Sequence, residues 1–180
     1  PVEFYQAAHA ILSNYGITSA SVQSNGSLLN EQWIHGVKKW NWKYSISFDG
    51  KHNSLTRGHT DAVLQALNLL KELHFPAGII RVVTPENVAF LADDYDFVKP
   101  FVSAFDFNHV FRTNTTNPLA ETTTYLEQYA ILLDNWLNDP SPIRVRNFDG
   151  FLSYLLGVDK YLCSYSGTCV FTFLSINPRG

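Results

Sequence analysis

Hydrophobic positions along the chain recur with two alternating periods, one typical of α-helices and one typical of β-strands. Helical spacing covers residues 2–15, 31–40 and 60–74, and strand patterns cover residues 17–23, 42–48, 77–83 and 100–107. Asn30 and Thr60 stand where residues that cap helix N-termini are expected. The stretch AGIIRVV at residues 77–83 is an apolar run of the kind that predicts a strand buried on both faces.

The order strand, loop, helix, repeated four times, predicts an α/β fold with parallel strands. An open α/β sheet and a barrel of the TIM type both satisfy that order, and in both the ligands bind at the carboxyl ends of the strands. In this chain those ends carry small polar residues, which are Ser24-Asn25-Gly26, Ser47-Phe48-Asp49-Gly50, Thr84 and Phe107-Asn108-His109. Such residues are equally typical of turns and helix caps, so spacing alone does not decide between a site and a set of turns.

The pattern changes in the last third of the chain. A polar stretch after residue 112 leads into an amphipathic helix, residues 140–146 indicate a linker, and FDGFLSYLLG predicts a last helix. The aspartates of LADDYDF, Asp93, Asp94 and Asp96, are interpreted as a hydrated helix end. We therefore expect one part at residues 1–146 and a second at residues 147–180.

Composition and charge exclude several classes of protein. The 180 residues are 46% hydrophobic, which predicts a folded globular domain, and the net charge of −3 without a basic run argues against a nucleic-acid partner. No apolar stretch approaches the roughly 18 residues that span a bilayer, so we expect a cytoplasmic protein without a membrane anchor. The chain lacks Met, begins with Pro and ends in the turn-forming Asn-Pro-Arg-Gly, so it is interpreted as a fragment of a longer protein.

The central segment carries a family resemblance. YSISFDGKHNSLTRGHTDAVLQALNLLKELHFPAGIIRVVTPEN contains a strand that ends in S-x-D-G, then an Arg, a long helix and a VVT..N strand. It resembles the middle of radical S-adenosylmethionine (radical SAM) enzymes of the SPASM group, which mature peptides and proteins, and VQSNGSLLNEQWI resembles the strand and helix that precede it. The resemblance implies that residues 1–146 are the C-terminal part of an α/β, TIM-like partial barrel of the radical SAM type. Residues 147–180 would then be a linker helix and the beginning of a SPASM iron-sulfur domain.

The resemblance also implies a cofactor site. Ser47 would hold polar groups of S-adenosylmethionine, and Arg57 would pair with its carboxylate, for which the fork of an arginine is suited. Asn25 and Asn108 would line the same pocket, although each is equally typical of a turn or cap. The family usually has Pro after Asp-Gly and HD shortly before the Arg, whereas this chain has DGKHNSLTR.

Both cysteines, Cys163 and Cys169, lie in the tail CSYSGTCVFTFLSINPRG. The resemblance implies that Cys169 is a ligand of an auxiliary 4Fe-4S cluster, with Cys163 as a companion. A disulfide, which the spacing allows, and a pair of inert core thiols are the alternatives. The family's CxxxCxxC motif is absent from the sequence, and two cysteines cannot ligate a 4Fe-4S cluster completely, so we expect this chain alone to be inactive.

The implied activity is that of an oxidoreductase that uses a 5'-deoxyadenosyl radical to modify a peptide. The modification would be a crosslink, thioether or cyclophane in a ribosomally made peptide, or the oxidation of a Cys or Ser in an anaerobic sulfatase. The implied cofactors are S-adenosylmethionine and 4Fe-4S clusters, and the implied partners are a peptide or protein substrate and an external electron donor. The alternative function is a non-catalytic α/β domain that binds a small metabolite in the strand-end pocket of a degenerate barrel.

Overall fold

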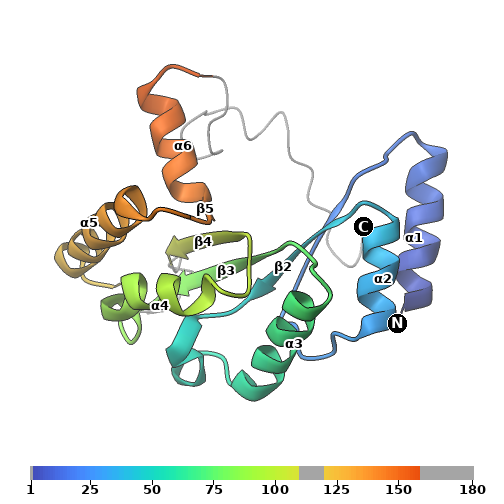
Figure 1. Ribbon diagram of the computed structural model, residues 1–180, viewed down its shortest axis with the longest axis horizontal. Helices are drawn as coiled ribbons and strands as arrows, with labels where there is room; N and C mark the ends of the chain where they lie inside the picture. Colours follow the sequence, from blue (N-terminus) through green and yellow to red (C-terminus); the bar gives the residue numbers. More distant parts are fainter. Residues whose placement is uncertain (1, 110–119, 159–180) are drawn as a thin grey trace, which may run out of the picture. The chain divides into compact units, whose positions relative to one another are not determined.

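The structure, a computed structural model, describes residues 2–109 and 120–158 (Figure 1). The chain forms two compact units, Pro1–Ile143 and Arg144–Gly180. The elements of the first unit are α1 (Val2–Asn14), β1 (Ser21–Ser24), α2 (Glu31–Lys39), β2 (Lys43–Ser47), the 3-10 helix η1 (Gly50–Leu55), α3 (Thr60–Glu72), β3 (Ala77–Val83), the 3-10 helix η2 (Val88–Phe90), α4 (Leu91–Val98), β4 (Ala104–His109) and α5 (Thr122–Asn138). The second unit begins with β5 (Arg144–Val145) and α6 (Arg146–Leu155). The predicted boundary after Arg146 and the two domain assignments stay predictions.

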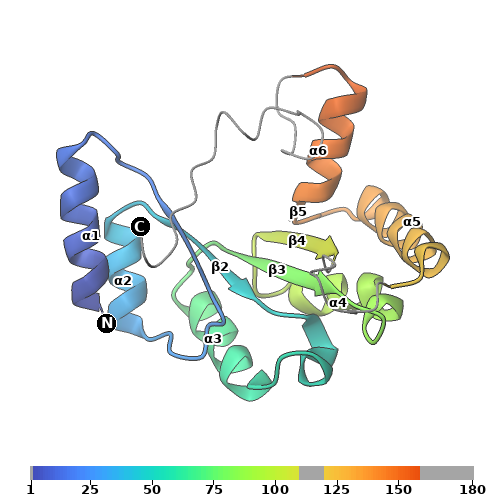
Figure 2. The same ribbon diagram turned by 180° about the vertical axis from the view of Figure 1, so that it is seen from behind.

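Strands β1 to β4 of the first unit are parallel and lie side by side in chain order. Ser47 at the end of β2 pairs with Ile80 of β3, and Ile80 pairs with Asp106 of β4. Helices α3 and α4 lie on the same side of these strands in both views (Figures 1 and 2). A doubly wound open sheet reverses its strand order at a switch point, whereas a barrel wall does not. The observed order therefore confirms the predicted α/β class and favours the barrel alternative.

Burial in β3 alternates along the strand, which corrects one expectation. Ala77, Ile79, Arg81 and Val83 are buried, whereas the residues between them are half-buried. The run AGIIRVV is therefore not buried equally on both faces, as its composition predicted. Its deeply buried face carries a charged residue, Arg81, for which the fold must supply a partner.

The helices bury the faces that their periodicity predicts. In α3, Val63, Leu67 and Leu70 are at most 2% exposed. Helix α1 has no buried residue and packs through aromatic contacts, such as the edge-to-face pair of Tyr5 and Trp33, whose ring centroids are 5.5 Å apart. Aromatic pairs of this geometry add about 0.5–1.5 kcal/mol beyond area burial.

The two predicted helix caps have different outcomes. The side chain of Asn30 accepts a hydrogen bond from the N–H of Trp33 at 2.9 Å, so the predicted cap of α2 is confirmed. The cap of α3 is wrong, because Thr60 is already the first helical residue and His59 before it adopts a left-handed conformation with φ 52°. The Thr60 hydroxyl instead accepts a hydrogen bond from the amide of Asn53 at 3.2 Å.

A buried ion pair joins Arg81 on β3 to Asp94 on α4, and both residues are 0% exposed. Nε and Nη2 of Arg81 lie 2.9 and 2.8 Å from Oδ2 of Asp94, and Nη2 also donates to the carbonyl oxygen of Asn87. Burial lowers the pKa of Arg81 and raises the pKa of Asp94, because the loss of water disfavours both charges. The interpretation of the aspartates as a hydrated helix end is therefore wrong for Asp94, whereas Asp93 and Asp96 are exposed.

The second carboxylate oxygen of Asp94 holds the turn that follows β2. Oδ1 accepts a hydrogen bond from the N–H of Lys51 at 2.9 Å. Gly50 has a positive φ of 77°, and a β-carbon added there would lie 2.1 Å from this oxygen. Only glycine fits this position, and Asp94 thereby fixes the start of the segment between β2 and α3.

Substitution of Asp94 by Asn should destabilise the chain strongly, because it leaves the Arg81 guanidinium charged and unpaired in the interior. We expect the free energy of unfolding to fall by about 3–5 kcal/mol, measured by urea denaturation. Asp93→Asn on the same helix is the matched control and should change it by at most about 0.5 kcal/mol. Equal small effects of the two substitutions would contradict this account of the ion pair.

Candidate functional site

A cavity of about 270 Å³ lies at the carboxyl ends of β1 and β2, beside the start of α3. Its lining comes from the residues that follow β1, from the end of β2, from the segment between β2 and α3 and from α3 itself, namely Asn25, Ser47, Asn53, Arg57, Gly58, His59 and Val63. This is the end of a parallel sheet at which ligands bind in α/β folds. All of these residues except Gly58 and Val63 carry polar side chains.

Ser47 reaches the cavity because it is the last residue of β2 and lies on the half-buried face of the sheet. Its hydroxyl accepts a hydrogen bond from Nε2 of Gln23 at 2.9 Å. That contact fixes the position of the Ser47 oxygen and directs its own proton elsewhere, so the hydroxyl can donate to a ligand.

Asn25 both shapes a turn and lines the cavity. Its side-chain oxygen accepts hydrogen bonds from the N–H of Ser27 at 3.2 Å and from the hydroxyl of Ser27 at 2.9 Å. This is the local turn geometry typical of asparagine. Asn25 therefore stabilises a turn with its side-chain oxygen, and its side-chain NH2 group is the part left to donate to a ligand.

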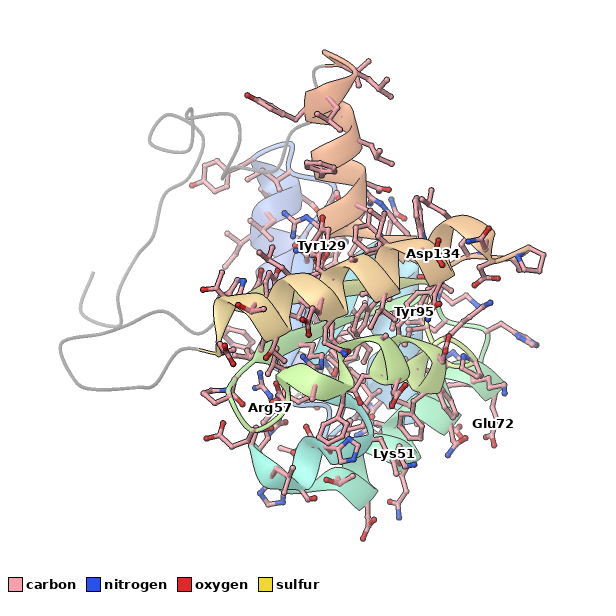
Figure 3. All side chains as sticks on the ribbon, turned by 90° about the vertical axis from the view of Figure 1, so that its left-hand side faces the viewer. Lys51, Arg57, Glu72, Tyr95, Tyr129 and Asp134 are labelled. Atoms are coloured by element: carbon pink, nitrogen blue, oxygen red, sulfur yellow. The ribbon has the colours of Figure 1, made fainter. Side chains whose placement is uncertain are left out.

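Arg57 is held against the cavity wall by a buried carboxylate. Its Nε lies 2.9 Å from Oδ2 of Asp49, and the side chains are 31% and 2% exposed, respectively. Figure 3 labels Arg57 together with Lys51, and both belong to the segment that joins β2 to α3. The cavity thus has one positively charged group whose position is determined by the fold.

Asn53 organises this segment from inside. Its side-chain oxygen accepts the N–H of Asp49 at 3.1 Å, and its amide donates to the carbonyl oxygen of Gly58 at 2.8 Å. Its own carbonyl oxygen accepts the N–H of Arg57 at 2.9 Å. Because Asn53 is 1% exposed, its amide group is fully committed to this loop. Asn53 therefore sets the shape of the wall and contributes little chemistry of its own.

The structure brings three of the four predicted cofactor residues together and leaves one apart. Asn25, Ser47 and Arg57 share the cavity, whereas its lining among the described residues does not include Asn108. Asn108 is exposed on β4, where it pairs with Val82, so two strand spacings of about 4.8 Å separate it from β2. The assignment of these residues to a cofactor stays a prediction.

The sequence named Asp49 only as one of several strand-end residues and assigned it no role, and it did not single out Asn53. Asp49 stands in the S-x-D-G motif and would have been found by asking which carboxylate balances Arg57. Asn53 carries no motif, and only its four-residue spacing from Asp49 hints at the loop that it closes.

The candidate metal ligands cannot be placed, because Cys163 and Cys169 lie outside the described residues. Within residues 2–109 and 120–158, no cluster of three or more His, Cys, Asp or Glu side chains is arranged to bind a metal ion. In the same ranges no helix is long and apolar enough to cross a membrane.

A singly wound parallel sheet with a polar cavity at its strand ends is the architecture of a ligand-binding barrel wall, and solved structures with a similar fold include an enzyme with bound AdoMet. The native anSMEcpe with bound AdoMet superposes with a TM-score of 0.74 at 21% identity, over 87% of this chain and 49% of that one. The same enzyme with bound AdoMet and the Cp18Cys peptide superposes with a TM-score of 0.74 at 22% identity. These likenesses show the fold.

Sequence relatives agree with the structural likeness, although no family model matches the chain. It is 24% identical to the serine-type anaerobic sulfatase-maturating enzyme of Bacteroides thetaiotaomicron, over 94% of this chain and 49% of that enzyme. It is also 24% identical to the cysteine-type enzyme of Clostridium novyi, over 96% of this chain and 52% of that enzyme. The chain is a homologue of the anaerobic sulfatase-maturating enzymes, and the predicted resemblance to radical SAM maturases is confirmed. It spans about half the length of the curated relatives it matches.

Proposed function

We propose that this chain forms the S-adenosylmethionine-binding wall of a radical SAM enzyme that matures a protein or peptide. The observation that carries the proposal is the convergence of Ser47, Asn25 and Arg57 on one cavity at the carboxyl ends of β1 and β2. The relatives support the same function, and they do not support the alternative of a non-catalytic metabolite-binding domain.

The residues of the cavity fit the amino-acid end of S-adenosylmethionine. The terminal nitrogens of Arg57 suit the cofactor's carboxylate, since a guanidinium offers parallel donors at carboxylate spacing. The hydroxyl of Ser47 and the amide of Asn25 suit its uncharged polar groups. No side chain caps the N-terminus of α3, so its positive end, next to His59 in the lining, adds to the attraction for an anion. A volume of about 270 Å³ is below the ~300–1,000 Å³ of typical ligand sites, so this cavity suits one end of the cofactor.

The chemistry of such an enzyme is supplied by its cofactors, and the task of this chain is to hold one of them. When bound, S-adenosylmethionine and a reducing 4Fe-4S cluster supply the radical that takes hydrogen from the substrate. Two cysteines do not complete the ligand set of a 4Fe-4S cluster, so no complete cluster is assigned to this chain. We assign Cys169, with Cys163 as its companion, to an auxiliary cluster of a SPASM region that would begin after α6.

The relatives support a proposal for the substrate class. Serine-type and cysteine-type sulfatase-maturating enzymes act on sulfatases, and one structural neighbour was solved with a peptide. We propose that the substrate is a peptide segment of a sulfatase or of a similar protein. We also propose that an external electron donor is a partner and that the protein is cytoplasmic. Crosslinking of a ribosomally made peptide is the second modification to be distinguished.

Arg57→Ala should weaken the binding of S-adenosylmethionine to the full-length, anaerobically reconstituted protein. We expect its Kd to rise about 10- to 100-fold, because a hydrogen bond to a charged group contributes about 1.5–3 kcal/mol. Isothermal titration calorimetry measures the change. Lys51→Ala is the matched control, since it removes an exposed positive charge from the same segment without touching the cavity lining. An unchanged Kd in Arg57→Ala would refute the assignment of this site.

The reduced full-length protein should oxidise a sulfatase-derived peptide that carries Ser or Cys at the target position. Mass spectrometry and capture by a hydrazide would detect the aldehyde, and the same peptide with Ala at that position should remain unchanged. A hydrogen-deficient product that does not react with hydrazide would identify crosslinking instead. Absence of any product with both the Ser peptide and the Cys peptide would contradict the sulfatase class.

Cys169→Ser should lower the iron and labile sulfide content of the full-length protein by the equivalent of about one 4Fe-4S cluster. Ser166→Ala, three residues away, is the control and should leave both contents unchanged. An iron content that stays the same in Cys169→Ser would favour a disulfide or an inert thiol at this position.

A further inference from the structure

Asp49 is a buried charged residue next to the candidate site, although it is not part of the cavity lining. It is 1% exposed. Its Oδ1 accepts the N–H of Val82 on β3 at 2.9 Å, and its Oδ2 accepts the hydroxyl of Thr56 at 2.5 Å. Asp49 therefore has a position fixed by the neighbouring strand, independently of any ligand.

Arg57 takes its orientation from this carboxylate. Its Nε lies 2.9 Å from Oδ2 of Asp49, and its backbone N–H is held by the carbonyl oxygen of Asn53 at 2.9 Å. Both the backbone and the guanidinium of Arg57 are thus bonded to the segment that follows β2. The side chain is 31% exposed, and Arg57 is part of the cavity lining.

The side of the guanidinium that Asp49 contacts determines what remains for a ligand. A guanidinium has five N–H donors in a plane, and a carboxylate can approach either the edge with Nε or the edge with both terminal nitrogens. Asp49 approaches Nε, so the edge with the terminal nitrogens is the one left for a second carboxylate. This arrangement gives bidentate recognition without a search among side-chain rotamers.

We propose that Asp49 is a positioning residue that fixes Arg57 for recognition of the cofactor's carboxylate, and that it acts only through Arg57. The proposal rests on the function proposed above and names what determines specificity at that site. Its consequence is selective: Asp49 contributes to binding of a ligand with a carboxylate and contributes nothing to a ligand without one.

Asp49→Asn tests this, because Asn keeps an oxygen for the N–H of Val82 but turns an amide donor towards Arg57. The probes are S-adenosylmethionine and 5'-methylthioadenosine, which retains the nucleoside and lacks the amino-acid carboxylate. In the full-length, anaerobically reconstituted protein we expect the Kd of S-adenosylmethionine to rise about tenfold, the loss of roughly one hydrogen bond. The Kd of 5'-methylthioadenosine should change by less than about twofold, within the noise of such a comparison. Asp61→Asn, an exposed aspartate in the first turn of α3, is the control for loss of one negative charge.

A second pair of variants keeps the test decisive if Asp49→Asn folds poorly. Arg57→Lys retains the charge at the cavity but has no Nε edge for Asp49 to hold, so it should lose S-adenosylmethionine affinity as Arg57→Ala does. In the Arg57→Ala background, Asp49→Asn should have no further effect on the Kd. Retention of affinity by Arg57→Lys, or a further loss in the double variant, would overturn the proposal.

The outcomes separate this inference from the proposed function. If Arg57→Ala weakens S-adenosylmethionine binding but Asp49→Asn does not, the cofactor site stands and the positioning role is wrong. If Asp49→Asn weakens both probes equally, Asp49 has a structural role and the inference is overturned. If Arg57→Ala has no effect on S-adenosylmethionine, the site itself is misassigned.

Discussion

The ion pair between Arg81 and Asp94 is the constraint on which the candidate site depends. A charged pair with no exposure to water is costly unless its geometry is good and its remaining atoms are hydrogen-bonded. Here Nε and Nη2 of Arg81 are engaged by Asp94, and the second oxygen of Asp94 is used for the N–H of Lys51, whereas Nη1 of Arg81 is buried without a hydrogen-bond partner among the described residues. The pair therefore does more than join β3 to α4, because it also determines where the segment after β2 begins.

A second carboxylate continues this arrangement towards the cavity. Asp49 bonds the backbone of β3 at Val82, one residue beyond Arg81, and holds Arg57 with its other oxygen. The segment from Gly50 to Arg57 is thus attached at its start by Asp94 and at its end by Asp49. A loop fixed at two points by buried carboxylates can hold a binding residue in place before the ligand arrives, which lowers the entropy that binding costs.

The sequence predicted the class of fold and much of the site, because both depend on local pattern. The alternation of strands and helices, the buried face of α3 and the strand-end positions of Asn25 and Ser47 follow from periodicity, whereas Arg57 was assigned through the family resemblance. Asn108 does not line the cavity with the other three residues, because sharing a sheet edge does not make two residues neighbours, and the strand order decides the distance between them. Asp94 was predicted to be exposed to solvent because it lies in a cluster of aspartates. Only its ion pair with Arg81, which lies 13 residues away in the sequence, shows that it is buried. The neglected signal was Arg81 within an apolar strand, since a buried arginine requires a buried carboxylate nearby.

The absent side chain of Gly50 constrains how this sequence can diverge. The space that a β-carbon would need is filled by the carboxylate of Asp94, so residues 50 and 94 do not drift independently. A lineage that shortens the residue at 94 to make room loses the counter-charge of Arg81 in the same step. Positions 50, 81 and 94 are therefore coupled through the carboxylate of Asp94, and we expect a replacement at one of them to destabilise the chain unless the others change with it.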